Sequence, residues 1–376
     1  MTDAGMNALL PDGLRDGLPP DAAHESAIAA RLVEAFGRFG YARVEPPLVE
    51  FEDTLLDGAA ASIANATFRL MDPVSQRMMG VRADMTLQVA RIATTRLANA
   101  PRPLRLAYAG HVLRVRGSQL RPEREFRQAG VELIGAAEAA ADAEVIALAA
   151  TALSDAGVAD ISTDINLPTL VPGLCERLDP AARDRLRVAL DRKDTEAAAA
   201  EGGNLFAQLL DATGPAPTAL AALQAIDLPP EAAAERARLA VVVDLVQAAR
   251  PDIMITVDPV EHRGFEYHSG LSFTLFARGV RGEIGRGGRY RACAGETATG
   301  FSLFLDSIMR AVPAMQPPSR LFLPFGVSAD TAAAVRAKDW ICIAGLGPVD
   351  DVQGEARRLG CTHILENGEP VALGDG

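Results

Sequence analysis

The pattern of hydrophobic and polar residues predicts two helices in the first half of the chain. Residues 22–39 carry apolar side chains at helical spacing, and Gly40 follows them as a C-terminal stop. This stripe predicts an amphipathic helix, which needs a partner surface on which to bury its apolar side. A second helix is expected over residues 138–156, and it ends at Gly157.

The segments between and after these helices are short, and several alternate polar and apolar residues as strands with one solvent-facing side do. Because mostly short or irregular links separate them, the pattern favours an antiparallel sheet over a doubly wound parallel one. A closing helix is expected over residues 304–312. The expected strands are residues 42–49, broken by Pro46 and Pro47, and then 68–71, 77–82, 104–116, 124–134, 253–257, 265–277 and 283–290.

Alanine-rich helical sequence interrupts this sheet from residue 167 to residue 250. It predicts a helical insertion (167–250) between the two parts of a core, residues 1–166 and 251–314. Beyond a proline-rich linker, strands and helices alternate, so residues 320–376 predict a small C-terminal α/β domain. The fold class is therefore α+β, with an antiparallel sheet flanked by helices.

Composition narrows the class of protein. A chain of 376 residues with 49% hydrophobic content can bury a sizeable core, and its net charge of −12 disfavours a general nucleic-acid binder or a polybasic membrane protein. The four cysteines lie far apart without a C-x-x-C pair, which argues against a disulfide framework and a zinc ribbon. The first thirty residues resemble no targeting signal, and no apolar run approaches eighteen residues, so we expect a soluble, cytoplasmic protein.

Residues 113–135 form two candidate strands joined by a polar loop. A strand period of two places Gln128 and Glu132 on one face. If that face is buried, both side chains need partners, because an unpaired buried carboxylate or amide costs several kcal/mol. A ligand with donor groups would satisfy them. A solvated strand face with ordinary ion pairs is the alternative.

A second cluster, residues 261–270, holds two of the five histidines. His262, Glu266 and His268 would share a strand face, which suggests zinc, but the spacing matches no helical histidine pair and no cysteine is nearby. We therefore expect no metal, and polar groups presented to a small molecule instead. The glycine-rich residues 285–290 would let backbone approach a ligand closely, although they form neither a Walker A nor a Rossmann pattern.

A third segment, residues 81–86, ends a strand just before a helix. Asp84 or Thr86 could therefore simply cap that helix. The functional alternative is a carboxylate and a hydroxyl aimed at an ammonium group.

In order along the chain, these segments resemble the core of class II aminoacyl-tRNA synthetases, and specifically histidyl-tRNA synthetase, over residues 8–312. In that family the motif 1 proline lies at the dimer interface, which places Pro47 there. The matching segments are residues 40–50 for motif 1, 81–86 for L-R-P-[DE]-x-T, 114–135 for motif 2, 263–268 for the R-G-L-D-Y-Y histidine box and 287–290 for G-G-R-Y.

The resemblance implies a pocket for the ammonium, carboxylate and imidazole groups of histidine. The second tyrosine of the histidine box is a histidine here, so one imidazole contact departs from the family pattern. The implied histidine-binding residues are Asp84, Thr86, Arg114, Gln128, Glu132, Arg263, Tyr267, His268 and Tyr290.

The ATP side of the same resemblance is altered. Arg116 stands where the family has the motif 2 glutamate that meets adenine, and Phe304 and Ser307 replace the motif 3 glycine and the arginine that binds the γ-phosphate. A ring and a hydroxyl cannot clamp a phosphate as a guanidinium does. Losing such contacts would together cost several kcal/mol, so we expect no adenylation, no catalytic residues and no cofactor.

A histidine pocket without ATP chemistry is similar to the family of regulatory subunits of ATP phosphoribosyltransferase. The tail agrees with this, because residues 320–376 hold five basic and eight acidic residues and would repel the phosphates of an anticodon stem. The resemblance implies a short-form catalytic subunit as partner, L-histidine as effector, and a homodimer within a hetero-octamer, with no nucleic acid or membrane partner. A divergent histidine-adenylating enzyme and a free-standing histidine sensor are the alternatives.

Overall fold

The computed structural model of the protein describes residues 9–57, 61–118, 121–176, 178–261, 267–292, 295–315 and 318–374. Contacts divide the chain into two compact units, Met1–Pro313 and Ala314–Gly376. The subdivision of the first unit into a core and a helical insertion stays a prediction.

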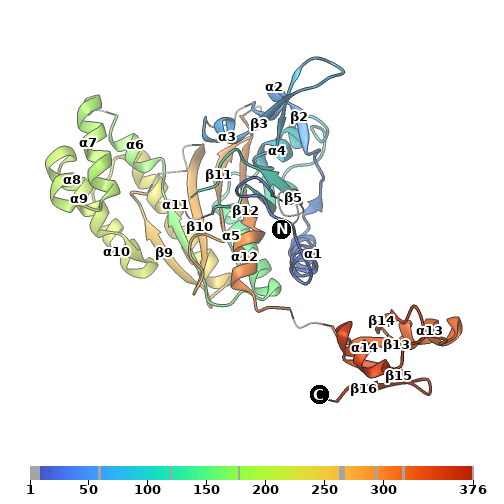
Figure 1. Ribbon diagram of the computed structural model, residues 1–376. Helices are drawn as coiled ribbons and strands as arrows, with labels where there is room; N and C mark the ends of the chain where they lie inside the picture. The colour runs from blue at the N-terminus through green and yellow to red at the C-terminus, as the bar shows by residue number, and fades with distance from the viewer. Residues whose placement is uncertain are drawn as a thin grey trace. The chain divides into compact units, whose positions relative to one another are not determined.

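A nine-stranded mixed sheet runs through the first unit (Figure 1). Neighbouring strands are antiparallel apart from the β1–β5 and β7–β9 pairs, which are parallel. The expected α+β fold is confirmed, with these parallel pairs as an addition to the expected antiparallel sheet. In order across the sheet, the strands are β1 (Ala42–Arg43), β5 (Leu104–Leu113), β6 (Glu125–Ile134), β12 (Thr297–Phe304), β11 (Gly285–Arg291), β10 (His268–Ala277), β7 (Ile161–Asn166), β9 (Met254–Asp258) and β8 (Gly214–Pro215).

Helices cover one face of this sheet and bury its apolar side chains. α1 (Asp21–Arg38) and α5 (Ala139–Ala156) pack against each other, and both contact β6. Leu32 and Phe36 of α1 are fully buried, and the Phe36 ring meets the edge of the Phe301 ring at a centroid distance of 5.5 Å. Burying each such side chain contributes roughly 1.5–3 kcal/mol. The stripe of the first predicted helix therefore has its partner surface.

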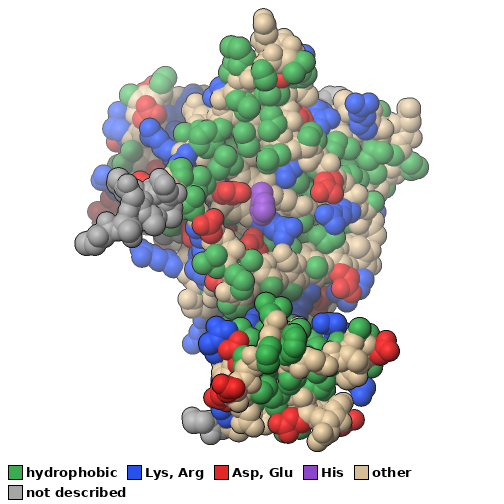
Figure 2. Space-filling view, turned by 45° about the vertical axis from the view of Figure 1, so that its right-hand side comes forward, with side chains coloured by type: hydrophobic (Ala, Val, Ile, Leu, Met, Phe, Trp, Pro, Cys, Tyr) green, Lys and Arg blue, Asp and Glu red, His purple; other side chains and the backbone are tan. Residues whose placement is uncertain are grey.

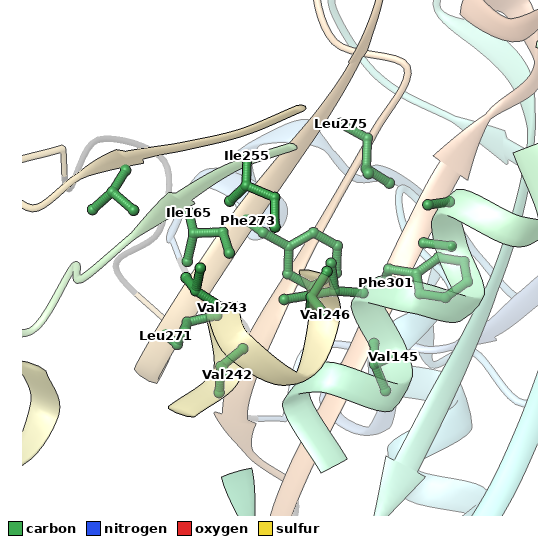
Figure 3. Packing of buried hydrophobic residues seen from close by; sticks show 14 of the residues in the cluster. Val145, Ile165, Val242, Val243, Val246, Ile255, Leu271, Phe273, Leu275 and Phe301 are labelled. Carbon is green, nitrogen blue, oxygen red and sulfur yellow. The ribbon is translucent and has the colours of Figure 1, made fainter. Parts of the chain in front are cut away.

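The same core continues toward β7 and β9. Figure 3 shows Val145 of α5 and the valines of α11 (Pro230–Ala249) beside Phe273 of β10. Val242 and Val246 are fully buried, as is Phe273. One layer of apolar side chains thus joins α5 and α11 to the centre of the sheet.

The insertion helices, α6 to α11, follow β7. Their starts have local causes: the Asp179 carboxylate accepts a hydrogen bond from the Ala182 amide at 3.0 Å, and Pro180 occupies the first helical position. No helix in the described part of the chain is long and apolar enough to cross a membrane. The insertion helices are α6 (Leu170–Leu174), α7 (Pro180–Asp191), α8 (Thr195–Gly202), α9 (Asn204–Asp211), α10 (Ala216–Gln224) and α11.

A second, three-stranded sheet orders β2 (Val49–Phe51), β4 (Met78–Val81) and β3 (Phe68–Met71). β3 and β4 form a projecting hairpin, and Figure 2 shows hydrophobic side chains gathered at that end of the molecule. The exposed apolar residues of the hairpin are Leu70, Met71, Val74 and Met78. The remaining helices of the first unit are α2 (Glu52–Leu55), α3 (Ala61–Ala66), α4 (Thr86–Thr94) and α12 (Leu305–Ala311).

Three strands of the large sheet, β7, β8 and β12, are not predicted by the hydrophobic pattern, and the short β8 lies within the segment expected to be helical. β12 reads Thr-Ala-Thr-Gly-Phe-Ser-Leu-Phe, and almost all of it is buried. Its small and polar side chains on one face conceal an ordinary strand alternation, because that face lines a polar cavity rather than apolar core. The register sets Gly300 opposite Glu132 and Phe304 opposite Gln128.

The second unit is a small α/β structure with strand order β14-β13-β15-β16. The expected alternation of strands and helices is present, and an additional strand follows it. Asn367 and Gly368 both have positive φ, so they turn the chain into a hairpin of β15 and β16 that the pattern does not predict. The elements are β13 (Arg320–Leu323), α13 (Ala329–Arg336), β14 (Ile341–Ala344), α14 (Val352–Arg358), β15 (His363–Glu366) and β16 (Glu369–Ala372).

Candidate functional site

Strand register gathers polar side chains on one face of the large sheet. On β6, Gln128 and Glu132 point to this face, whereas Val131 and Leu133 point into the core beneath α1 and α5. β5 lies on one side of β6 and β12 on the other, so their side chains flank the same two residues. The buried-face interpretation of residues 113–135 is therefore correct.

Glu132 is the most buried carboxylate of this face, with 1% of its surface exposed. The Tyr290 hydroxyl donates to Oε2 at 2.8 Å, and the Tyr108 hydroxyl lies 3.3 Å from Oε1. Burial raises the pKa of Glu132 to about 8, although these hydrogen bonds oppose the shift. At neutral pH the side chain therefore carries a proton.

Close backbone approach also shapes the surroundings of Glu132. A Cβ atom placed on Gly300 would lie 2.0 Å from the Glu132 Oε2 atom. A side chain at position 300 would therefore displace the carboxyl group. Glycine at this register position therefore leaves room for the Glu132 carboxyl group.

Asp84, Thr86 and Gln128 form a connected polar group beside Glu132. Gln128 Nε2 donates to Asp84 Oδ2 at 2.8 Å and to the Ser302 hydroxyl at 2.6 Å, and Gln128 Oε1 accepts from the Met85 amide at 3.0 Å. Asp84 Oδ1 accepts from the Thr86 amide at the start of α4. Asp84 thus holds the first residue of α4 with one oxygen while its other oxygen meets Gln128. The N-cap residue of α4 is Met85, and ligand binding by Asp84 stays a prediction.

Arg114 lies at one wall of the cavity above this face. Its Nε donates to the Ala83 carbonyl at 3.2 Å, and its guanidinium lies 5.0 Å from the centre of the Phe126 ring. Burial lowers the pKa of Arg114, and the nearby Asp84 carboxylate opposes that shift. The cavity is lined by Ile63, Asp84, Thr86, Leu87, Arg114, Glu132, Tyr267, Arg286, Gly287, Gly288, Tyr290, Gly300, Phe301 and Ser302.

The structure brings most of the predicted site residues to this one cavity. Gln128 is fully buried just behind its wall. His268 has 6% of its surface exposed, pairs with Tyr290 in the strand register and does not line the cavity; the Tyr267 ring stacks on it at 4.0 Å instead. Arg263 lies outside the described residues. The six predicted residues that line the cavity are Asp84, Thr86, Arg114, Glu132, Tyr267 and Tyr290.

Two residues of the site are missed by sequence reasoning. Tyr108 is fully buried, and its hydroxyl lies within 3.3 Å of polar atoms of Thr86, Glu132 and Ser302. Ser302 links the same hydroxyl to Gln128. The sequence holds one signal for Tyr108. Strand alternation places it on the same face of β5 as Gly110, and a buried tyrosine hydroxyl needs polar partners.

Of the positions that differ from the synthetase pattern, Phe304 pairs with Gln128 in the strand register, whereas Arg116 and Ser307 do not line the cavity that holds Glu132. Arg116 is exposed, whereas Ser307 is buried in α12 and accepts a hydrogen bond from Arg310 at 2.9 Å. The Phe304 ring is buried, and the Arg121 guanidinium lies 3.7 Å from its centre. These contacts give Phe304 and Ser307 structural partners.

Metal ligation finds no support among the described residues, where no group of three histidine, cysteine, aspartate or glutamate side chains could hold an ion. His262 and Glu266, the other members of the suspected zinc set, lie outside the described residues. Pro47 is exposed, and its carbonyl accepts from Gln88 Nε2 at 2.8 Å. The interface role of Pro47 stays a prediction.

Comparison with known proteins identifies the class and then the family. The family model described as histidyl-tRNA synthetase matches residues 13–308. The sheet and its polar cavity are thus those of a histidyl-tRNA synthetase-like protein with the class II fold. The chain is 56% identical over 370 residues to a protein from Paramagnetospirillum magneticum named ATP phosphoribosyltransferase regulatory subunit, covering 97% of this chain and 98% of that protein. The chain belongs to this family of regulatory subunits.

Two further proteins agree with that assignment. A protein of the same name from Rhodospirillum centenum is 55% identical, covering 98% of this chain and 97% of its own length. A crystal structure described as an ATP phosphoribosyltransferase regulatory subunit/histidyl-tRNA synthetase, from Bacillus halodurans, superposes with a TM-score of 0.81 at 25% identity, covering 93% and 96% of the two chains. Fold and family are therefore those that the sequence motifs indicate.

Proposed function

We propose that this regulatory subunit binds L-histidine in the cavity above β6 and passes that signal to a short-form catalytic subunit. In this proposal the chain activates the catalytic subunit, and bound histidine mediates feedback inhibition of the first step of histidine biosynthesis. The chain itself carries out no chemistry. It acts as a homodimer within a hetero-octamer of regulatory and catalytic subunits.

The observation that carries the proposal is the pairing of a buried carboxyl group with open space beside it. Glu132 is held by tyrosine hydroxyls, Gly300 leaves room for its carboxyl group, and both residues line the cavity. An imidazole ring fits the polarity of this group, because its ring nitrogens can donate and accept hydrogen bonds. Glu132 and Tyr290 would then contact the imidazole.

The other groups of an amino acid have counterparts around the same cavity. The Asp84 carboxylate and the Thr86 hydroxyl would accept hydrogen bonds from an ammonium group. The Arg114 guanidinium would pair with a carboxylate. Gln128 would hold Asp84 in place through its 2.8 Å hydrogen bond.

Regulation requires that histidine bind more tightly to one assembly than to another. The insertion helices provide a physical connection to the site. Arg238 of α11 lies 2.6 Å from the buried Asp142 of α5, and Asp142 also pairs with Arg289, the neighbour of Tyr290 on β11. A change in the position of α11 would therefore shift Asp142 and Arg289, and Arg289 is the neighbour of Tyr290, which would contact the imidazole.

Titration calorimetry with the purified chain tests histidine binding. Replacing Glu132 by Gln removes the proton that the carboxyl group would share with the imidazole, so we expect a loss of roughly 1.5–3 kcal/mol in binding free energy. Glu366→Gln, at an exposed glutamate of the second unit, is the matched control and leaves the affinity unchanged. Equal affinities for wild type and Glu132→Gln would place the histidine site elsewhere.

The regulatory role is tested with the catalytic subunit. We expect the two chains to co-purify, turnover of the catalytic chain to depend on this one, and histidine inhibition to be lost with Glu132→Gln. Histidine binding without any effect on the catalytic chain would indicate a free-standing sensor. Histidine-dependent pyrophosphate exchange with ATP on the isolated chain would indicate an adenylating enzyme instead.

A further inference from the structure

Lys193 lies in the turn between α7 and α8 of the insertion. It directly follows Arg192, the C-cap residue of α7, and its φ of 54° is left-handed. The Lys193 amide donates to the Leu190 carbonyl at 3.0 Å. The Asp194 amide donates to the Ala189 carbonyl at 3.0 Å, which completes a Schellman motif. Glycine is the residue that favours this position, so the local backbone gives no reason for a lysine.

Composition gives no reason for a lysine there either. Of the 37 basic residues in the chain only Lys193 and Lys338 are lysines, so arginine is the ordinary basic residue of this sequence. The side-chain contact supplies the reason. The Lys193 ammonium lies 2.5 Å from Asp258 Oδ2 at the carboxyl end of β9, and the Asp258 side chain is only 13% exposed. A carboxylate that is mostly buried needs such a counter-charge.

The Asp258 carboxylate joins three segments of the chain. Besides its pair with Lys193, its Oδ1 atom accepts a hydrogen bond from the Val260 amide at 3.2 Å and from the Thr213 hydroxyl at 3.4 Å. Thr213 directly precedes β8, and Val260 follows β9. The ion pair therefore ties the insertion helices to the end of β9, on their side of the large sheet (Figure 1).

One row of register partners leads from Asp258 across the sheet to the proposed histidine site. The row crosses β9, β7, β10, β11, β12 and β6, and cross-strand partners of this kind share one face of a sheet. The last three members line the cavity. The Lys193 pair and the buried carboxyl group of the cavity thus lie at opposite ends of one row. In order, its members are Asp258, Asn166, Ser272, Gly288, Gly300 and Glu132.

The middle of this row has two arrangements open to it. The pairing of β10 with β11 is irregular between His268 and Ser272, and such an irregularity loosens the ladder locally. Asn166 and Ser272 are almost fully buried. Even so, Asn166 Oδ1 and the Ser272 hydroxyl have no hydrogen-bond partner in the part of the chain that the structure describes. A small movement of β7 against β10 would let the hydroxyl donate to Oδ1 and would remove the cost of two unpaired buried groups.

We propose that Lys193 is a positioning residue for the histidine site. Its ion pair with Asp258 selects the arrangement of β7 and β10, and so links the position of the insertion helices to the shape of the cavity. This link rests on the proposed binding of histidine in that cavity. It is separate from the Arg238–Asp142 contact, which reaches β11 through α5, because Lys193 acts through the sheet. Linkage is reciprocal, so bound histidine should also change the turn between α7 and α8.

Calorimetry with L-histidine on variants of the full chain tests this role. Lys193→Gly removes the ion pair but suits the left-handed turn. It should lower histidine affinity about fivefold or more, which is the lower end of typical coupling between sites, and should leave the melting temperature close to that of the wild type. Lys193→Arg keeps the positive charge and should bind histidine as the wild type does. A residue that only stabilised the fold would lower affinity and melting temperature together.

Two matched controls change a charge elsewhere. Lys338→Gly replaces the other lysine, which is exposed in the second unit. Arg185→Gln breaks the exposed 2.9 Å pair with Glu201 within the insertion. Both should leave histidine affinity unchanged. Equal losses of affinity in Arg185→Gln and Lys193→Gly, or no loss in Lys193→Gly, would overturn the proposal.

Hydrogen exchange separates this proposal from histidine binding itself. Without ligand, Lys193→Gly should speed the exchange of amides in β7 and β10, because these strands lose their tether to the insertion. In the wild type, histidine should slow exchange at the turn between α7 and α8, and this effect should be absent in Lys193→Gly. If the wild type binds no histidine, the proposed function fails, and the exchange without ligand decides the link alone. Unchanged exchange in β7 and β10 would overturn that link.

Discussion

Glu132 shows how a single buried group gives the cavity its chemistry. Burial alone makes its charged form unfavourable, and the hydroxyls of Tyr290 and Tyr108 only partly offset this. The folded protein therefore keeps a proton that the unfolded chain releases. Two measurable properties, stability and histidine affinity, follow from that proton.

Stability should fall as the pH rises through the range in which only the unfolded chain has lost the Glu132 proton. The folded pKa is about 8 against 4.5 in the unfolded chain, so the folded state binds more protons between these values. The contribution is present below pH 4.5 and is lost as the pH approaches 8, with a slope of up to about 1.4 kcal/mol per pH unit. Denaturant unfolding across this range should show a flatter profile for Glu132→Gln than for wild type. Identical pH profiles for the two proteins would contradict this contribution of Glu132 to stability.

Histidine affinity should have a bell-shaped pH dependence if Glu132 shares its proton with the imidazole. Free imidazole gains its own proton below about pH 6.5, after which binding must release one. Above about pH 8 the empty site has lost its proton, so binding must take one up. Calorimetric titrations at several pH values should give the tightest binding between these limits. In Glu132→Gln the alkaline decline should disappear, and its persistence would assign that decline to another group.

The position of the Glu132 carboxyl group also depends on the glycine at position 300. Gly300→Ala would place a methyl carbon 2.0 Å from Glu132 Oε2, so we expect at least a tenfold loss of histidine affinity and a lower melting temperature. Gly37→Ala is the control, because nothing lies within 4 Å of its added carbon in α1. That change should stabilise by roughly 0.5–1 kcal/mol. Thermal melts and calorimetry distinguish the two.

At the scale of elements, the site depends on four adjacent strands. Gln128 and Glu132 can be predicted from the sequence because they repeat with strand period between apolar residues. Tyr108 cannot be distinguished from a core residue, and Ser302 lies on β12, whose small residues hide its alternation. His268 packs against the Tyr267 ring and does not line the cavity, and its predicted contact with histidine stays a prediction. Strand alternation in the sequence shows which residues share a face of the sheet. The register between strands, which the sequence does not show, decides which side chains contact one another.

The Asp142 network fixes α5 to β11 and to the insertion helices. Its carboxylate has no exposed surface and pairs with Arg289 at 2.7 Å and Arg238 at 2.6 Å. Asp142→Asn would leave a buried guanidinium without its counter-charge, so we expect a loss of about 3–5 kcal/mol in unfolding free energy. Asp252→Asn, in an exposed pair with Arg250, should cost at most about 1 kcal/mol. Urea unfolding measures both, and similar small losses would contradict a structural role for Asp142.

At the scale of the whole molecule, the first unit carries the site and a hydrophobic hairpin, and the second unit is a separate acidic α/β structure. Fold class and family were within reach of the sequence because several ordered motifs agree. The surface that would contact a catalytic subunit cannot be predicted from the sequence, because exposed apolar side chains such as Leu70 and Met71 follow no pattern that distinguishes an interface from a solvent-facing strand.

Self-association through the Pro47 region can be tested directly. Leu48 is 48% exposed beside Pro47, and a charge there would be costly to bury in an interface. Leu48→Glu should therefore shift the dimer toward monomer in sedimentation velocity. Leu346→Glu, at a residue of the second unit that is 98% exposed, should not. An unchanged dimer with Leu48→Glu would remove this region from the interface.

The residues of the cavity come from positions 63 to 302, with β12 lying between β6 and β11 late in the chain. Contacts of such long sequence separation form slowly and only when most of the unit is already in place. The cavity therefore forms only when β12 is in place. A chain that lacks β12, or in which β12 is misplaced, loses both Gly300 and the Ser302 hydroxyl from the cavity. Any ligand that binds there stabilises the complete fold against global unfolding. The fraction of cavities that hold a ligand thus depends on how much of the protein is completely folded as well as on the ligand concentration.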